Sequence, residues 1–206
     1  MTTTQTPINA LILVCTLSPS PKASSSDLLA RQVAAEFKEH QVSTEILRIA
    51  DFNVKPGVLK DMGDGDQWPA IRQKLLSADI LVLATPIWVG HPSSLAQRVL
   101  ERLDAELSET DEQGRPILFG KVGLVAVVGN EDGAHHVIAD LGQGLSDAGF
   151  TLAAQGSTYW VGQAMHTTDY QDLQQTPEVT ANATGIATRN SAHLARLLKA
   201  SPYPAG

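Results

Sequence analysis

Residues 8–27 read INALILVCTLSPSPKASSSD, and this stretch decides the fold. Its first part, Ile8 to Cys15, is an apolar run typical of a buried β-strand, and the second part is a turn rich in serine and proline. A helical pattern follows. A strand that leads through such a turn into a helix brings hydroxyl groups, backbone N–H groups and the positive end of a helix dipole together. The stretch therefore predicts an anion-binding site at the start of the first helix.

The rest of the chain alternates between strand-like and helical patterns. Apolar runs recur at Ile46 to Ile49, Ile80 to Ala84, Val122 to Val128 and around Thr151 to Ala154, with helical spacing between them. Together with Ile8 to Val14 they indicate an α/β, doubly wound fold, in which a parallel sheet of five strands has helices on both faces. Ligands bind such sheets beyond the carboxyl ends of the strands. We therefore expect the loops after strands one, three and four to share one crevice.

Five helices are expected from the spacing of apolar residues. The first follows the serine-rich turn and ends at His40, and the second has Pro69 in its first turn and Asp66 as its cap. The third begins near Ser93. The fourth runs from about residue 134 to 149, and the last covers roughly residues 177 to 200.

Composition limits the class of protein. The chain has 206 residues, a net charge of -7 and a single cysteine, Cys15, which we expect to be buried. We expect one domain over residues 1–206, with residues 1–6 as a disordered tail. The apolar runs are shorter than the roughly 20 residues that span a bilayer, and no secretion signal is evident, so a cytoplasmic protein without a membrane segment is expected. The lack of basic clusters argues against nucleic-acid binding.

Serine hydroxyl groups dominate the loop after the first strand. They stand where a dinucleotide-binding protein would have a G-x-G-x-x-G turn, and the loop also lacks the G-x-x-x-x-G-K-[ST] pattern of nucleoside triphosphatases. Hydroxyl donors suit a terminal phosphate monoester. The alternative is structural, with residues Ser24 to Asp27 serving only to cap the helix. The position of the loop after strand one favours the phosphate.

The loop after the third strand, Thr85 to Ser93, contains two prolines, a glycine and Trp88. Proline and glycine fix the backbone, and a large ring in a turn favours contact with a planar aromatic ligand over burial in the core. The alternative packs Trp88 against a neighbouring helix or a second subunit.

The loop after the fourth strand, Val128 to His136, is rich in glycine and acidic residues. Its glycines permit close approach of the backbone to the edge of a ring, and its N–H groups can bind carbonyl oxygens or ring nitrogens. In the alternative interpretation, Glu131 or Asp132 caps the fourth helix. The pair His135 and His136 suggests a metal, but adjacent residues of a helix face different directions, so no metal site is expected.

A further aromatic cluster, Tyr159-Trp160-Val161-Gly162, follows the fifth predicted strand and precedes the polar stretch Gln163 to Gln175. This segment is suited either to line a substrate pocket or to contact a partner subunit. The sequence leaves both interpretations open.

Three motifs at corresponding places resemble a known family. With Ser18-Pro19 and Ser24-Ser25-Ser26 after strand one, Thr85-Pro86-Ile87-Trp88-Val89-Gly90 after strand three, and Gly129-Asn130-Glu131-Asp132-Gly133 after strand four, the chain resembles the flavodoxin-like NAD(P)H-dependent FMN reductases. The resemblance spans about residues 8 to 160 and implies a three-layer fold with strand order 2-1-3-4-5. The chain departs from the family pattern in having Leu17-Ser18 instead of a Gly-Ser opening, and it lacks the cysteine cluster of the iron-sulfur relatives.

The resemblance also implies which residues bind FMN. The phosphate would be held by the serines of the first loop: Ser18, Ser24, Ser25 and Ser26. The isoalloxazine ring would be held by the other two loops: Pro86, Ile87, Trp88, Val89, Gly90, Gly129, Asn130, Glu131, Asp132 and Gly133.

The function implied is an FMN-dependent oxidoreductase that takes hydride from NAD(P)H and reduces a quinone, flavin or similar small electron acceptor by a ping-pong mechanism. His91 or His135 is expected to donate a hydrogen bond to the reduced ring. The alternative is a flavodoxin-type single-electron carrier that binds FMN but does not use nicotinamide; such carriers need a strongly charged docking face. Because Trp88 and Trp160 are expected to be exposed, a homodimer or homotetramer is expected to complete the pocket.

Overall fold

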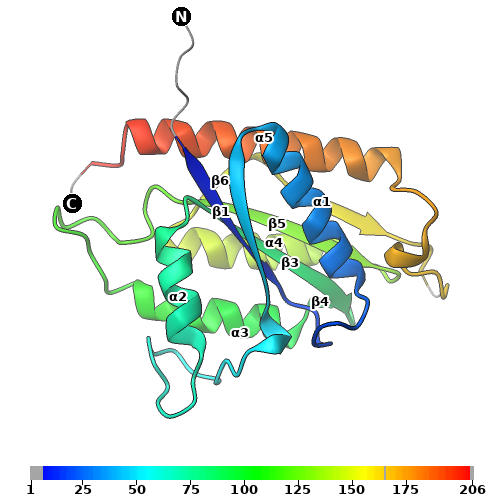
Figure 1. Ribbon diagram of the computed structural model, residues 1–206, viewed down its shortest axis with the longest axis horizontal. Coiled ribbons are helices and arrows are strands. Elements are labelled where there is room, and N and C mark those ends of the chain that lie inside the picture. The colour runs from blue at the N-terminus through cyan, green and yellow to red at the C-terminus, as the bar shows by residue number, and fades with distance from the viewer. Residues whose placement is uncertain (1–6, 165, 205–206) are drawn as a thin grey trace, which may run out of the picture.

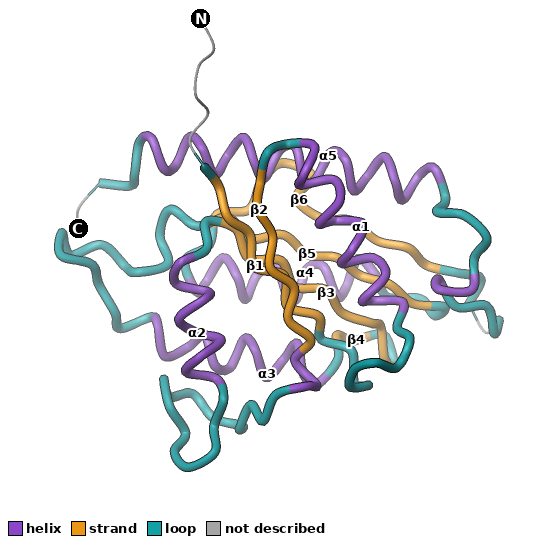
Figure 2. The backbone as a smooth tube through the Cα atoms, viewed as in Figure 1, coloured by secondary structure: helices purple, strands orange, loops and turns teal. Residues whose placement is uncertain are grey.

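A parallel β-sheet forms the centre of the molecule (Figures 1 and 2). The computed structural model describes residues 7–164 and 166–204, so the predicted disordered tail, residues 1–6, lies outside the described residues. The long strands are β1 (Ile8–Val14), β2 (Val42–Arg48), β3 (Ile80–Trp88), β5 (Val122–Gly129) and β6 (Thr151–Val161). They pair in parallel in the order β2-β1-β3-β5-β6. Numbered along the chain, this is the order 2-1-3-4-5, which confirms the prediction.

A short sixth strand, β4 (His91–Pro92), was not predicted and pairs antiparallel with the end of β3. Three short 3-10 helices, also not predicted, lie at η1 (Ile49–Asp51), η2 (Asp104–Glu106) and η3 (Tyr170–Asp172). Of these, η1 follows β2 directly, so the apolar run at residues 46–49 contains a strand end and a turn of helix. The strand itself begins four residues earlier than predicted, at Val42.

Two layers of helices sandwich the sheet. Helices α1 (Ser25–Glu39) and α5 (Glu178–Ala200) cover one face, where Ile12, Val82 and Leu124 point toward them. Helices α2 (Trp68–Ser77), α3 (Ser94–Leu103) and α4 (Ala134–Ala148) cover the other face, where the alternate strand residues form a second core. Because successive side chains of a strand point to opposite faces, one apolar run supplies both cores. The three predicted layers are confirmed.

The third strand is longer than predicted. It continues through Thr85 and Pro86 to Trp88, so this motif is largely strand and not loop. The pairing of β3 with β1 ends at Ala84, whereas its pairing with β5 continues through Pro86 opposite Val128. The proline thus lies beyond the end of the pairing with β1, and a strand can hold a proline where no partner needs its N–H group.

The last strand is also longer than predicted, because β6 includes the cluster Tyr159-Trp160-Val161. Its pairing with β5 shifts register between Gly123 and Val125, and Gln155 has a positive φ of 53° within the irregular part. This bulge interrupts the apolar alternation, which explains why the sequence pattern ended the strand near Ala154.

Helix ends follow the predicted chemistry at most positions. Ser24 and Ser93 cap α1 and α3 by accepting backbone N–H groups, and Gly149 ends α4 with a positive φ of 110°. Gln67, and not the predicted Asp66, occupies the cap position of α2, but the Asp66 carboxylate accepts the backbone N–H of Trp68, the first helical residue, at 3.1 Å. Asp66 also pairs at 2.8 Å with buried Arg102. Burial alone would raise the pKa of Asp66, but backbone N–H groups and Arg102 outweigh it and lower the pKa to about 2.

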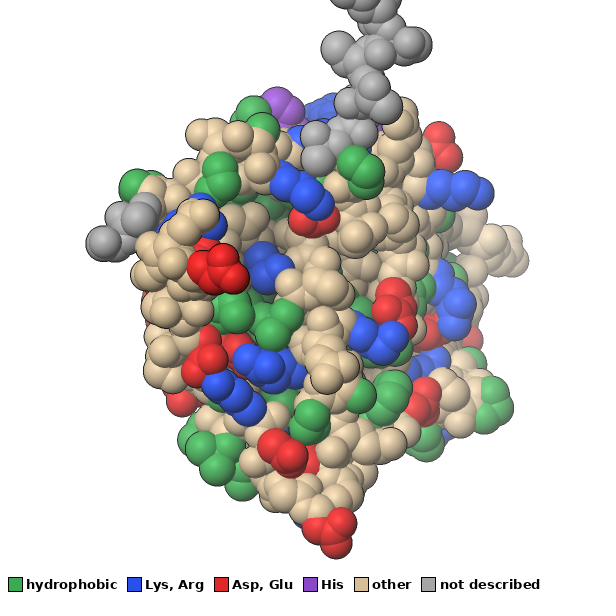
Figure 3. Space-filling view, turned by 60° about the vertical axis from the view of Figure 1, so that its left-hand side comes forward, with side chains coloured by type: hydrophobic (Ala, Val, Ile, Leu, Met, Phe, Trp, Pro, Cys, Tyr) green, Lys and Arg blue, Asp and Glu red, His purple; other side chains and the backbone are tan. Residues whose placement is uncertain are grey.

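The surface carries charges of both signs. On the face in Figure 3, the Lys and Arg side chains are interspersed with Asp and Glu, and neither sign dominates a large area. Among the helices of the described residues, none has the length and apolar composition needed to cross a membrane.

Candidate functional site

The β1–α1 loop presents its serines at the start of a 15-residue helix. Ser24 Oγ accepts the backbone N–H of Asp27 at 3.4 Å, so the predicted capping role is confirmed for this serine. Ser25 is the first helical residue, Ser26 is buried, and Ser18 is half-buried before the helix. The N–H groups in the first turn of a helix have no partner within it, so this end of α1 favours an anion.

Two tethers hold this loop from outside. The Asp51 carboxylate accepts the backbone N–H and the hydroxyl of Ser20 at 2.6 and 2.7 Å, and these hydrogen bonds lower its pKa. Arg48, at the end of β2 and almost fully buried, donates to the Lys22 carbonyl at 2.7 Å and pairs with Asp27 at 3.3 Å. The loop therefore has a fixed position relative to β2 and η1.

The motif after the third predicted strand forms a β-hairpin. Trp88 pairs with His91 across the sharp turn Val89-Gly90, in which both residues have positive φ, 54° and 75°. Positive φ at both central positions is the mark of a type I′ turn, and it strains a β-branched residue such as valine. Trp88 and Val89 are 54% and 86% exposed. Pro86 is half-buried and Ile87 is buried, so Ile87 faces the core and not the crevice.

Close backbone contact joins the hairpin to the loop after β5. A Cβ atom on Gly133 would lie 2.9 Å from the Gly90 carbonyl oxygen, and one on Gly129 would lie 3.0 Å from Ile87 Cβ. Gly133, which has a φ of 121° and meets backbone atoms, therefore needs to be glycine, whereas a side chain at position 129 would require the Ile87 side chain to shift. Gly133 also precedes α4 at the cap position, so the predicted caps Glu131 and Asp132 are wrong. The Asp132 carboxylate accepts the Gly133 N–H at 2.7 Å.

The segment around η3 links the first loop to the loop after β5. Asn130 donates from its side-chain amide to the Asp169 carboxylate at 2.9 Å, and the Gln171 N–H donates to Ser25 Oγ at 3.3 Å. Together with the contact between Gly90 and Gly133, these bonds connect all three predicted loops at the carboxyl ends of β1, β3 and β5. The three loops thus lie together at this edge of the sheet, as expected, and contacts join them to one another.

The aromatic cluster divides between the core and the surface. Trp160 is half-buried and packs against Tyr170 at 5.4 Å between ring centroids, so the expectation that it is exposed is wrong. Tyr159 is the exposed member, and its hydroxyl lies 3.2 Å from His135 Nε2. A hollow of about 600 Å³ is lined by these two residues, Val161 and the start of α4. His91 is not among the residues that line this hollow; its side chain lies next to His136, which does line it, and next to Asp140.

Sequence reasoning missed Arg48, Asp169 and Gln171 as residues that position the loops. Arg48 meets Asp27 across 21 positions, and Gln171 meets Ser25 across 146. No local pattern signals such contacts. The polar stretch after β6 was left open between two interpretations, and its described part packs against its own chain at η3.

The family model for NADPH-dependent FMN reductases matches residues 9–166, which is most of the chain. The chain belongs to this family. The match includes β1 through β6 and all three loops. An FMN-binding, flavodoxin-like oxidoreductase family is therefore established for this chain.

Two curated relatives resemble this FMN reductase family member over nearly its whole length. The 8-demethyl-8-aminoriboflavin-5'-phosphate synthase of Streptomyces davaonensis is 30% identical, over 95% of this chain and 80% of its own. The divalent metal cation transporter MntH of Mycobacterium bovis is 36% identical over 94% of this chain. The chain spans only 29% of that transporter's length.

Solved structures agree with the fold. RosB with bound 8-demethyl-8-formylriboflavin-5'-phosphate superposes with a TM-score of 0.86 at 30% identity, covering 95% of this chain and 82% of that one. A flavodoxin of Streptococcus pneumonia superposes with a TM-score of 0.57 at 14% identity, covering 90% and 98%. The second likeness concerns the fold alone.

Proposed function

We propose that this chain is an FMN-dependent oxidoreductase that takes hydride from NAD(P)H and reduces a quinone, flavin or similar small acceptor by a ping-pong mechanism. The observation that carries the proposal is the connection of the three loops. Three contacts connect the loop proposed to bind phosphate with the two loops proposed to bind the flavin ring. They are the hydrogen bond from Gln171 to Ser25, the hydrogen bond from Asn130 to Asp169 and the contact between Gly90 and Gly133. A phosphate joined to a flat heteroaromatic ring fits this arrangement.

The phosphate would be held by the N-terminus of α1 with Ser18, Ser24, Ser25 and Ser26. Ser24 and Ser25 each accept a backbone N–H with their hydroxyl oxygen, which leaves the hydroxyl hydrogen free to donate. Capping the helix and binding a phosphate are therefore compatible roles for the same serine. Ser26 is 2% exposed, so we assign it a backbone contact in the first turn.

The ring would be held by the hairpin and by the loop after β5. Pro86, Trp88, Val89 and Gly90 offer an apolar edge, while Ile87 supports them from the core. Gly129, Asn130, Asp132 and Gly133 offer backbone groups close to the hairpin. Glu131 Oε1 is buried without a hydrogen-bond partner among the described residues, and it suits a ring N–H donor.

FMN, when bound, supplies the two-electron redox chemistry, accepting hydride from NAD(P)H and passing the electrons to the acceptor. The chain orients the ring, and its exposed Trp88 side leaves room for the two substrates to bind in turn. His135 and His91 are the candidate donors, and His135 remains the better placed because it lines the 600 Å³ hollow. Replacing each by alanine and measuring turnover tests the assignment.

One experiment separates reductase from carrier. The visible spectrum of the purified protein is recorded, and NADPH or NADH is then added without oxygen. Rapid bleaching of bound FMN supports the reductase, whereas bound FMN that nicotinamide does not reduce contradicts it and favours the carrier.

A second experiment tests the phosphate assignment. The variants Ser24→Ala and Ser25→Ala are expected to weaken FMN binding far more than riboflavin binding, because only FMN carries the phosphate. Ser94→Ala is a matched control, since Ser94 is the first residue of α3 as Ser25 is of α1. Equal losses for the two flavins would contradict the assignment.

A second candidate function treats the flavin phosphate as substrate. Its support is the similarity to 8-demethyl-8-aminoriboflavin-5'-phosphate synthase over 95% of the chain. The test incubates the protein with FMN, oxygen and an amine source and follows the flavin by mass spectrometry. Replacement of a methyl by an amino group supports this function, and unchanged FMN after NADPH turnover supports the reductase.

The oligomer we propose is a homodimer or homotetramer in the cytoplasm, acting on a small-molecule acceptor and not on nucleic acid. The exposed Trp88 and Val89 support a partner subunit at the hairpin. Sedimentation velocity is expected to give a dimer or tetramer, and Trp88→Ser is expected to lower the association constant. A monomer at all concentrations would contradict this part of the proposal.

A further inference from the structure

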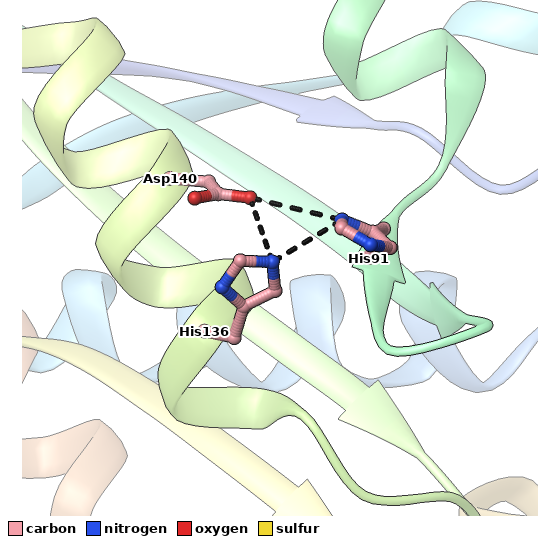
Figure 4. Close-up of side chains that lie close together, drawn as sticks. All are labelled: His91, His136 and Asp140. Carbon is pink, nitrogen blue, oxygen red and sulfur yellow. Dashed lines mark hydrogen bonds and ion pairs between the residues drawn. The ribbon is translucent and has the colours of Figure 1, made fainter.

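Three side chains from two elements converge beside the hairpin (Figure 4). His91 comes from β4, while His136 and Asp140 lie one helical turn apart on the same face of α4. His136 Nε2 lies 3.2 Å from His91 Nδ1 and 3.3 Å from Asp140 Oδ2. His91 Nδ1 lies 4.0 Å from the same carboxylate oxygen. Two nitrogens and one oxygen thus point at a common centre.

These separations match the coordination of a small divalent cation. Ligand atoms about 2.0–2.1 Å from a tetrahedral zinc ion lie about 3.3 Å from one another. Two imidazoles and a carboxylate are a donor set that suits zinc and neighbouring transition metals, whereas magnesium and calcium prefer oxygen ligands alone. The three side chains are 65%, 50% and 43% exposed, so an ion can reach them and a fourth position stays open to water.

We infer that His91, His136 and Asp140 form a binding site for a divalent transition-metal ion, with Zn²⁺ as the best match. This inference is independent of the proposed function. The site uses only one member of the adjacent pair His135 and His136, because His135 turns toward Tyr159. The sequence argument against a metal site was that the adjacent residues His135 and His136 face different directions. This argument does not apply to His91, His136 and Asp140.

The location gives the ion a structural consequence. It would join the β3–β4 hairpin to α4, two elements that are 45 positions apart at His91 and His136. His91 directly follows the turn Val89-Gly90, and Gly90 contacts Gly133 at the start of α4. A bound ion would thus stabilise the same hairpin contact that positions the proposed ring site.

The test is a zinc titration of the full chain, prepared without a histidine tag and treated with chelator. Calorimetry with a competing chelator is expected to give one zinc ion per chain. His136→Ala and Asp140→Asn are expected to weaken binding at least about 100-fold, since even outer partners of a metal site cost 10 to 100-fold. The matched control His135→Ala is expected to bind zinc as the wild type does. No binding by the wild type, or equal loss in the control, would overturn the inference.

Thermal unfolding supplies a second measurement that depends on the hairpin. Zinc at about 100 times its Kd is expected to raise Tm by about 5 °C or more, because a ligand of the folded state stabilises it. His91→Gln, an exposed position, is expected to fold normally and to lose this rise. If His91→Gln binds zinc and gains Tm like the wild type, the hairpin is not part of the site and the inference is wrong.

Discussion

The β1–α1 loop and the β3–β4 hairpin both lie at the carboxyl ends of the parallel strands, but different interactions hold them in place. The first loop is fixed by side chains that reach it from other elements, Asp51 to Ser20 and Arg48 to Lys22 and Asp27. The hairpin is fixed by its own pairing and by contact between two glycines, with Val89 in a strained conformation. Polar side-chain contacts thus position the β1–α1 loop, whereas backbone pairing and backbone conformation position the β3–β4 hairpin.

This difference predicts different sensitivities. Hydrogen bonds and ion pairs respond to charge and pH, whereas glycine contacts respond to added volume. Strain in a turn is retained in proteins mainly where the surrounding structure or a function requires it. We therefore expect the hairpin to tune ring binding and the first loop to tune phosphate binding.

The largest effect is expected for Gly133→Ala. Its Cβ would lie 2.9 Å from the Gly90 carbonyl oxygen at a φ of 121°, so both a clash and backbone strain oppose it. We expect a loss of about 3 kcal/mol in the free energy of unfolding and weaker riboflavin binding. Urea unfolding and flavin titration measure the two effects.

Its control is Gly120→Ala, which has a φ of 87° but no atom within 4 Å of the added Cβ. This variant is expected to lose only the stability that backbone strain costs and to keep its affinity for flavin. If both variants lose stability equally, the glycine contact does not hold the hairpin.

Arg48→Ala is expected to have the next largest effect. It removes a nearly buried guanidinium from Asp27, which keeps only its exposed partner Arg31, and it leaves the Lys22 carbonyl without this hydrogen-bond donor. We expect a stability loss of about 2 kcal/mol and a greater loss of affinity for FMN than for riboflavin. Arg31→Ala is the control, because Arg31 pairs with the same Asp27 at 2.7 Å but is 64% exposed. If Arg31→Ala lowers stability and FMN affinity as much as Arg48→Ala does, the burial of Arg48 is not the cause of its effect.

Val89→Asn, unlike the two variants above, is expected to increase the free energy of unfolding. It creates an Asn-Gly turn, the sequence that type I′ hairpins prefer, at a side chain that is 86% exposed and buries little. We expect a gain of about 1 kcal/mol, or a rise in Tm of about 2 to 4 °C. Val179→Asn, at an 82% exposed helical position, is expected to give no gain. An unchanged Tm for Val89→Asn would mean that the turn stores no strain.

The smallest expected effect is the contribution of Asp51 to the pH dependence of the free energy of unfolding. Hydrogen bonds from Ser20 lower the pKa of Asp51 from 3.8, so Asp51 stabilises the fold above that value. This contribution is expected to disappear as the pH falls below 3.8 through the lowered pKa, because protonation removes the acceptor charge. Unfolding of the wild type and of Asp51→Asn is compared across pH. The two are expected to differ near neutral pH and to converge in acid; a constant difference would contradict the tether.

Local patterns predicted most of the elements. The run Ile8 to Val14 and the helix capped by Ser24 follow from apolar spacing and from capping chemistry, whereas the strand order was implied by the family resemblance. The errors lie where a neighbour decides the outcome. Pro86 remains in β3 because β1 has already ended, and β6 continues past Ala154 because a bulge restores its pairing.

The sequence by itself determined the layers, the serine-rich turn and the glycine-rich loop, because periodicity and turn chemistry are local properties of the chain. Only the tertiary structure decided that Gly133 rests on Gly90, that Gln171 reaches Ser25 and that His91 faces His136. These contacts join residues between 43 and 146 positions apart. They depend on how the elements pack, and packing is fixed by the whole core and not by any single segment.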